Sequence, residues 1–141
     1  MKKTTEEILK LLKKSSDINT FMDTNSEDLV EKILLCDYLN QLLTQKELKK
    51  SDVIRNSGLD RKYCYEIFAG TKTPSRDKVL ALCFALQLSE AETTHLLKST
   101  GYAQFYPRIE RDSIILFALE HQLSLTDTNE LLFEMNQPCL E

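Results

Sequence analysis

The side chains that could bind a ligand are concentrated in the middle of the chain, and most of them are cations. Between Thr44 and Leu80 there are nine Lys or Arg against five Asp or Glu, a local excess of +4 in a chain whose net charge is −4. From Arg108 to the C-terminus, two basic residues stand against seven acidic ones. Because the distribution of charge decides which partner a surface attracts, we expect the central segment to face a polyanion. Chance clustering on solvated helix faces is the alternative explanation.

No other group of residues has the spacing of a reactive site. The four Cys contain no C-x-x-C pair, and only two His could join them in a metal site. His95 and His121 have no nucleophile and acid arranged around them, and no glycine-rich phosphate loop occurs. We therefore expect reduced, mostly buried thiols, no metal, no cofactor and no enzymatic activity.

The composition is that of an ordinary globular protein. The 141 residues suit one domain with a helical extension, and only three Gly and three Pro interrupt them, which favours helices joined by short turns. The sequence contains no run of about 18 apolar residues, the length that a membrane-spanning helix needs. The chain turns acidic at Glu6 without the apolar core of a signal peptide. We expect a cytoplasmic, all-α protein with no membrane partner.

The first third of the sequence predicts helices separated by a polar break. Thr4 and Glu7 have the spacing of a capping box, and a stripe of Ile and Leu follows them. Asp17 to Met22 suits one further short turn of helix, before a polar break at residues 23–26. Ser26 is then the expected N-cap of a long core helix. The apolar positions of that helix are Leu29, Val30, Ile33, Leu34, Tyr38, Leu39, Leu42 and Leu43.

Two short helices meet at a glycine in the centre of the chain. The first covers residues 49–57, and Gly58 suits a left-handed residue after its end. Leu59 is apolar, and Asp60 can cap the second helix, which runs to Gly70. Two short helices joined in this way form a helix-turn-helix.

Two pairs of helices are expected in the rest of the chain. Ser75 can cap the first helix and Ser89 opens the second, which Gly101 ends. The last two helices cover about residues 110–121, and about residues 124–135 with Ser124 as cap. The expected organisation is an N-terminal helical extension (residues 1–25), a helix-turn-helix domain (26–101) and a C-terminal helical pair packed on it (102–141).

Five residues have the order and spacing that mark the turns and helix ends of a known family: Gly58, Leu59, Asp60, Gly70 and Pro74. In these residues the chain resembles the Cro/C1-type (XRE, lambda-repressor-like) helix-turn-helix family. The similarity spans roughly residues 29–100, and the chain also resembles a subgroup of small Firmicutes-type regulators that carry a further C-terminal helical pair. The resemblance implies a lambda-repressor-like, five-helix DNA-binding domain with N-terminal and C-terminal helical extensions.

Three positions depart from the pattern of that family. Ile54 stands where the family prefers a small residue, and Lys50 stands where many members have Gln. Phe68 replaces the Glu that often precedes the closing loop. These departures favour a repacked variant whose base reading cannot be copied from the family.

In such a fold the first residues of the second helix reach into the major groove of DNA. Arg61 is the best candidate for a base contact, because a guanidinium can bond O6 and N7 of guanine together, and Lys62 could do so less specifically. Tyr63 and Tyr65 are two residues apart and do not share a helix face. One of them should pack inside while the other reaches DNA. For the two cations, a solvated surface position is the alternative.

Two helix starts could hold DNA phosphates, because free backbone N–H groups and nearby cations favour an anion there. The candidates are Lys49, Lys50 and Ser51 at the first helix of the pair, and Thr71, Lys72, Ser75 and Arg76 at the helix that follows. Ordinary capping is the alternative for the loop residues, and Ser75 should cap its helix in either case.

Together these features predict a sequence-specific transcriptional regulator that binds double-stranded DNA. A homodimer is expected, because operators are commonly read as two half-sites. Either the C-terminal helical pair or the N-terminal helix could form its interface. The second hypothesis is a protein–protein interaction adaptor that keeps a degenerate helix-turn-helix scaffold without reading DNA. The net acidity and the departures at Ile54 and Phe68 favour this alternative.

Overall fold

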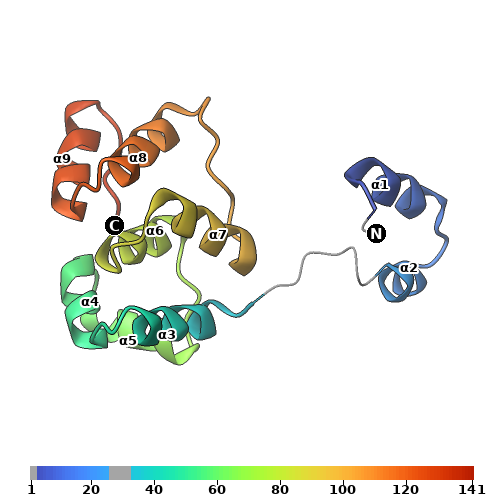
Figure 1. Cartoon of the computed structure of the whole chain (residues 1–141), viewed down its shortest axis with the longest axis horizontal. Coiled ribbons are helices and arrows are strands. Elements are labelled where there is room, and N and C mark those ends of the chain that lie inside the picture. The colour runs from blue at the N-terminus through green and yellow to red at the C-terminus, as the bar shows by residue number, and fades with distance from the viewer. Residues whose placement is uncertain (1–2, 26–32) are drawn as a thin grey trace. The chain divides into compact units, whose positions relative to one another are not determined.

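The computed structural model describes residues 3–25 and 33–141, and the regular structure in these ranges is all α-helical, as expected. The helices (Figure 1) are α1 (Thr5–Lys14), α2 (Ile18–Thr24), α3 (Leu35–Gln45), α4 (Lys50–Ser57), α5 (Arg61–Ala69), α6 (Arg76–Ala85), α7 (Glu90–Thr100), α8 (Glu110–Glu120) and α9 (Leu125–Glu134). None of these helices is long and apolar enough to cross a membrane. The chain divides into an N-terminal unit, Met1–Glu31, and a second unit, Lys32–Glu141.

The N-terminal unit contains two short helices. α1 begins after Thr4, whose Oγ1 accepts a hydrogen bond from the Glu7 amide (3.2 Å), which confirms the predicted cap. α2 begins after Asp17 and continues to Thr24, so the polar break starts later than predicted. Phe21 of α2 is buried, whereas α1 has no buried residue. The unit leaves five large apolar side chains exposed: Leu9, Leu11, Leu12, Ile18 and Met22.

Helix α3 begins later than the sequence predicted. The expected N-cap, Ser26, lies outside the described residues, but Ile33 and Leu34 are described and both precede the helix. The Ile33 amide donates to the Ser99 carbonyl at the end of α7 (2.9 Å), and Leu34 has an extended backbone (ψ 134°). Because this contact with α7 draws the backbone out of the helical path, the helix starts only at Leu35. The prediction that Ile33 and Leu34 belong to the helix was wrong.

Helix α6 lies at the centre of the second unit. Every residue from Val79 to Leu86 is buried, and both α4 and α9 pack on α6. Helix α3 packs on α5 and also on α7. Burying one Leu side chain contributes about 1.5–3 kcal/mol relative to leaving it exposed. Apolar contacts with α6 therefore hold α4 and α9 in place.

Two glycines end α4 and α5, as predicted. Gly58 ends α4 with φ +69°, and Gly70 ends α5 with φ +86°. Both angles lie in the left-handed region, which an L side chain rarely adopts. A Cβ at Gly58 would meet nothing within 4 Å, whereas a Cβ at Gly70 would lie 3.0 Å from the Cys36 sulfur. Gly70 is therefore favoured both by its backbone conformation and by the limited space beside Cys36.

Residues 76–97 and 111–132 are two copies of one sequence pattern, 35 positions apart. The first copy forms α6 and α7, the first hairpin, and the second copy forms α8 and α9, the second hairpin. The two helical pairs were expected from the sequence, but their similarity was not. The residues identical at equivalent positions are Arg76/Arg111, Asp77/Asp112, Gln87/Gln122, Leu88/Leu123, Ser89/Ser124, Thr93/Thr128, Leu96/Leu131 and Leu97/Leu132.

Both hairpins turn in the same way. Gln87 and Gln122 end their helices with φ of 58° and 56°. The amide of the next residue, Leu in both copies, bonds to the carbonyl five residues before it, at 3.1 and 2.9 Å. Ser89 and Ser124 then cap α7 and α9 through their side chains, as the sequence predicted. The repeated residues therefore specify the same turn twice.

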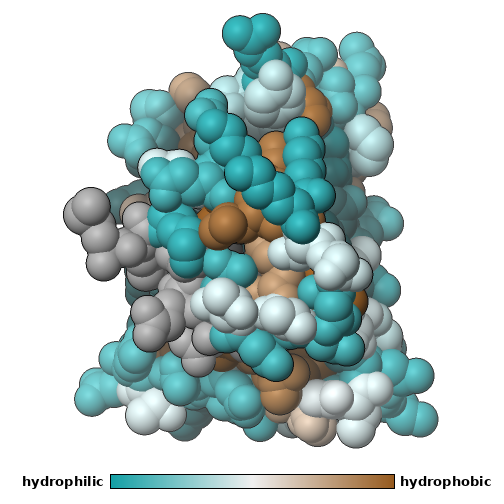
Figure 2. Space-filling view, turned by 90° about the vertical axis from the view of Figure 1, so that its right-hand side faces the viewer, coloured by the Kyte–Doolittle hydropathy of each residue, from teal (hydrophilic) through white to brown (hydrophobic). Residues whose placement is uncertain are grey.

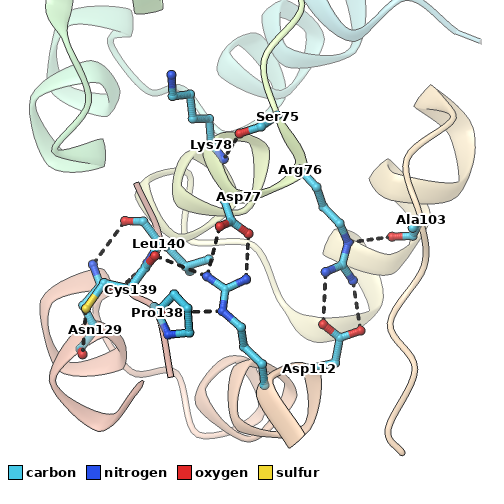
Figure 3. Close-up of polar contacts among 11 residues, drawn as sticks. Ser75, Arg76, Asp77, Lys78, Ala103, Asp112, Asn129, Pro138, Cys139 and Leu140 are labelled. Atoms are coloured by element: carbon cyan, nitrogen blue, oxygen red, sulfur yellow. Dashed lines mark hydrogen bonds and ion pairs between the residues drawn. The ribbon is translucent and has the colours of Figure 1, made fainter. Parts of the chain in front are cut away.

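Two ion pairs join the two hairpins, and in each of them the arginine of one copy contacts the aspartate of the other copy (Figure 3). The Arg76 guanidinium donates to both carboxylate oxygens of Asp112, at 3.0 and 3.2 Å. Arg111 donates in the same way to Asp77, at 2.8 and 3.0 Å. The Nε of each arginine also donates to the backbone carbonyl 27 residues later. The first helix of each hairpin packs on the second helix of the other, α6 on α9 and α8 on α7. The two hairpins are therefore related by an approximate twofold axis.

Candidate nucleic-acid interface

The turn between α4 and α5 is fixed by its own polar side chains. The Ser57 hydroxyl donates to the Ile54 carbonyl (2.6 Å) and accepts from the Leu59 amide (3.2 Å). The Asp60 carboxylate accepts from the Tyr63 amide (2.9 Å), which confirms the predicted cap of α5. A cap of this kind is typically worth about 1 kcal/mol. The start of α5 is therefore well positioned relative to α4.

The inward face of α5 is apolar. Cys64, Ile67 and Phe68 are buried, and α5 packs against α3. Burial raises the pKa of the Cys64 thiol, so the thiol is protonated and unreactive at neutral pH. This face is a packing surface, and the side chains available to a partner lie on the opposite face.

The outward face of α5 carries two cations and one tyrosine. Arg61 and Lys62 are exposed in the first turn of the helix. The Arg61 guanidinium lies 5.7 Å from the centre of the Tyr65 ring, within range of a cation–π contact. Tyr65 itself is 37% exposed. The structure thus identifies Tyr65 as the tyrosine that points away from the core.

Tyr63 packs inside, so its ring is not placed to contact a base as the sequence had suggested. Its ring is partly buried against the core, and the Lys78 amino group lies 4.3 Å from the ring centre. We therefore remove Tyr63 from the candidate base contacts. The same contact brings Lys78, which the sequence had not singled out as a site residue, beside α5.

One shallow hollow on the surface joins several of the predicted residues. It includes three of the candidate base contacts and one candidate phosphate contact. Its lining residues are Asp60, Arg61, Lys62, Tyr65, Glu66, Ala69 and Thr71. The hollow runs along the outward face of α5, from its cap to the residues just after its end.

The start of α4 lies beside the end of α5. The Lys50 amino group is 5.4 Å from the centre of the buried Phe68 ring, which is near the C-terminus of α5. Lys49 and Ser51 are exposed on either side of Lys50. The three predicted phosphate contacts of this helix start are therefore near α5, at the end opposite to Arg61.

The loop between α5 and α6 contains residues that cap helices. The Thr71 hydroxyl and amide both donate to the Glu66 carbonyl, at 3.2 and 3.0 Å. Ser75 Oγ accepts from the Lys78 amide (3.4 Å), so it caps α6 as expected. Lys72 is exposed, and its amino group lies 4.0 Å from the Glu66 carboxylate. Among these predicted phosphate contacts, Lys72 has the most accessible charge.

Arg76 does not have the position predicted for a phosphate contact. Its guanidinium bonds to Asp112 and to the Ala103 carbonyl (2.9 Å), and it lies 5.2 Å from the centre of the Phe105 ring. Asp112 is buried and also accepts from the Tyr106 amide (2.9 Å). Because a carboxylate 36 residues away holds the guanidinium, we remove Arg76 from the phosphate contacts. The repeated Arg-Asp pair was the sequence signal that could have revealed this role.

Two of the departures from the family pattern belong to the core. Ile54 and Phe68 are both buried, in α4 and α5 respectively. The third, Lys50, lies over Phe68. The structure therefore accommodates the larger apolar residues by packing them inside, which leaves the outward face of α5 unaffected.

Comparisons with protein-family models, with curated proteins and with solved structures found no match for this chain. The resemblance to the Cro/C1-type family rests only on the five residues named above, at the turn between α4 and α5 and at and after the end of α5. The function must therefore be inferred from the geometry of α4, α5 and the residues around them.

Proposed function

We propose that this chain is a sequence-specific, DNA-binding transcriptional regulator whose α5 reads bases in the major groove. The observation that carries the proposal is the exposed pair Arg61 and Lys62 at the capped N-terminus of α5. Residues at this end of the second helix are the ones that reach base edges in a helix-turn-helix. We assign base contacts to Arg61, Lys62 and Tyr65.

Arg61 is suited to the recognition of guanine. Its contact with Tyr65 restricts the guanidinium, so less conformational freedom is lost when it bonds O6 and N7 of the base. A good bidentate contact of this kind discriminates between bases by about 1–3 kcal/mol. Tyr65 is placed to contact either a base or a phosphate next to Arg61.

Phosphate contacts are assigned to lysines around both ends of α5. They are Lys49, Lys50, Lys72 and Lys78, with the Ser51 and Thr71 hydroxyls beside them, while Ser75 caps its helix. Each neutralised phosphate steepens the dependence of log K on log salt by about 0.9. Four such lysines correspond to a slope of about −3.6 for each subunit.

A homodimer is part of the proposal, because one small helix-turn-helix contacts too few base pairs to select an operator. Hydrophobic side chains are exposed among hydrophilic ones on the surface of the molecule (Figure 2). In the N-terminal unit they include Leu9 and Leu12 of α1, a helix with no buried residue. A second copy of α1 would cover these side chains, so this helix is our candidate for the dimer interface.

A binding titration tests the proposal. Labelled duplexes selected from a random library would be titrated with the full chain, with fluorescence anisotropy as the readout, over a range of salt concentrations. We expect sequence-selective binding that weakens with salt at about the slope given above. If no duplex shows salt-sensitive binding even at low salt, the chain does not bind DNA.

The second candidate function is a protein-interaction adaptor. The exposed Phe117 on α8, whose ring lies 4.1 Å from that of His121, favours it. An adaptor would bind one protein partner with equal affinity when the charges of Arg61 and Lys62 are reversed. The two candidates are therefore separated by whether binding depends on α5.

A further inference from the structure

The second hairpin leaves open the face that the first hairpin buries. Leu82 and Leu86 of α6 are 0% exposed, and α4 packs on this helix. Their counterparts 35 positions later are Phe117 and His121. Phe117 is 52% exposed and His121 is also exposed, and their rings are in tilted contact, with centroids 4.1 Å apart and an interplanar angle of 40°. Two buried leucines are thus replaced by an uncovered pair of rings.

The second helices of the two hairpins differ in whether their polar side chains have partners. On α7, Glu92 forms an ion pair with Lys46 (3.1 Å), and His95 is hydrogen-bonded to the Tyr38 hydroxyl (2.6 Å). Tyr38 belongs to α3, and Lys46 is the residue directly after the end of this helix. Helix α3 also packs on α7. The first hairpin therefore receives an apolar cover and a matching cation from α3 and α4.

On the second hairpin the matching positions of α9 are acidic and uncovered. Glu92, His95 and Ser99 correspond to Asp127, Glu130 and Glu134. We define the open face as Phe117, Glu120, His121, Asp127, Glu130 and Glu134, all of them exposed. Within residues 3–25 and 33–141, none of its four carboxylates forms an ion pair with a Lys or Arg.

We propose that the open face binds a basic amphipathic helix of a partner protein. The rings of Phe117 and His121 offer an apolar centre, and the exposed carboxylates of α8 and α9 favour Lys or Arg on the flanks of the bound helix. On the first hairpin, α4 and Lys46 already supply this combination of an apolar helix and a cation. The open face shares no residue with the DNA interface assigned to α5, so this proposal does not depend on DNA binding. It deepens the second candidate function, the adaptor, by naming the binding site and the chemical class of the partner.

A second copy of the chain is a poorer occupant of the open face. Two open faces brought together would oppose four carboxylates with four others, and like charges across an interface are unfavourable. The whole segment from Arg108 onward is acidic, with seven Asp or Glu against two basic residues. A basic partner is therefore the one that the charges favour, with Phe117 as the aromatic anchor at its centre.

The probe for this site is a synthetic peptide of Leu and Lys, about 18 residues long, with Leu at helical spacing so that it folds as an amphipathic helix. Its binding to the full chain would be measured by calorimetry at several salt concentrations. A peptide with Glu in place of every Lys is the control. We expect one peptide to bind per chain, more weakly as salt rises, and no binding of the Glu peptide.

Replacing the aromatic anchor tests whether the peptide uses the open face. We expect Phe117→Ser to weaken peptide binding about tenfold or more, because a central aromatic residue carries much of the binding energy. Phe133→Ser is the matched control, since Phe133 is 76% exposed and its counterpart on the covered hairpin, Lys98, is exposed as well. Circular dichroism would confirm that both variants are folded.

Neutralising the carboxylates is an independent test. The triple variant Glu120→Gln, Asp127→Asn, Glu130→Gln should bind the Lys peptide about tenfold more weakly at low salt and should lose most of the salt dependence. The control Glu6→Gln, Glu7→Gln, Asp23→Asn removes the same charge from the N-terminal unit and should bind like the unmodified chain.

Two results would overturn the proposal. One is that the unmodified chain does not bind the Lys peptide, or binds it no better than both the Phe117→Ser and the triple carboxylate variants do. The other is self-association that sedimentation detects without peptide and that Phe117→Ser abolishes, which would assign the open face to a second copy. Neither result bears on DNA binding by α5, which is measured separately.

Discussion

Arg111 of α8 holds both carboxylate oxygens of Asp77 on α6, and Arg76 holds those of Asp112 in the reverse direction. Bidentate contacts between a guanidinium and a carboxylate are the strongest that these groups form. Both arginine side chains are largely buried, 17% and 22% exposed. Removing one partner leaves a poorly solvated charge behind, so these pairs are sensitive points in the contact between the hairpins.

We expect Arg111→Ala to lower the free energy of unfolding by about 1–3 kcal/mol, because Asp77 and two backbone carbonyls lose their donor. Urea denaturation measures this change. Arg108→Ala, at an exposed position, is the control and should change stability little. A double-mutant cycle with Asp77→Ala should show coupling between the two residues. Strictly additive effects would contradict the pairing.

Arg76 and Lys78 should respond differently in DNA binding. Arg76→Gln should lower stability but leave the salt dependence of binding unchanged, because its guanidinium is held by Asp112. Lys78→Gln should reduce the log–log slope by about 0.9, the contribution of one phosphate contact. Anisotropy titrations over a range of salt concentrations distinguish the two variants. The opposite pattern would return Arg76 to the phosphate contacts.

Reversing the two cations at the start of α5 should separate binding from folding. We expect Arg61→Glu with Lys62→Glu to abolish DNA binding while the helical content stays unchanged, since both side chains are exposed. Circular dichroism and the anisotropy assay provide the two readouts. If the variant unfolds, these residues have a structural role. If it still binds DNA, the interface lies elsewhere.

Gly58 and Gly70, at the ends of α4 and α5, offer a matched comparison of conformation and space. Gly58→Ala should cost about 1–2 kcal/mol, the usual penalty for an L residue in a left-handed conformation. Gly70→Ala should cost more, because its Cβ would also lie 3.0 Å from the Cys36 sulfur. Thermal or urea denaturation measures both. Equal losses would mean that Cys36 moves aside freely.

Glu92 makes the stability of the fold depend on pH. A hydrogen bond from the Ser89 amide, with a contribution from Lys46, lowers the pKa of Glu92 below its usual value of 4.5. Because the pKa is lower in the folded state, the ionised Glu92 stabilises the fold above about pH 4.5, and this contribution is lost as the pH falls through the folded pKa. Glu92→Gln should therefore flatten the acid side of the stability profile measured by urea denaturation. Identical profiles for the two proteins would contradict this role.

The sequence predicted best those features that depend on neighbouring residues. Thr4, Asp60 and Ser75 cap helices where expected, because a cap needs only an oxygen within reach of an amide three residues later. Gly58 and Gly70 end their helices as expected, because a left-handed residue is a local requirement. The all-helical architecture followed from the same signals together with apolar periodicity.

Features set by distant residues could not be predicted in this way. The start of α3 depends on a hydrogen bond from Ile33 to Ser99, and the position of Arg76 depends on Asp112. Which of the two tyrosines of α5 packs inside was decided by its neighbours in space, Lys78 among them. Local spacing carries no information about these partners.

The repeated hairpins also have a consequence for the order of folding events. The turn of each hairpin forms through a hydrogen bond between residues five positions apart, Leu88 to Cys83 in the first and Leu123 to Ala118 in the second. The ion pairs of Arg76 and Arg111 join residues 36 and 34 positions apart and need both hairpins. Since local contacts close with less loss of chain entropy, the two turns can form independently, and the ion pairs form at the later step in which the hairpins dock.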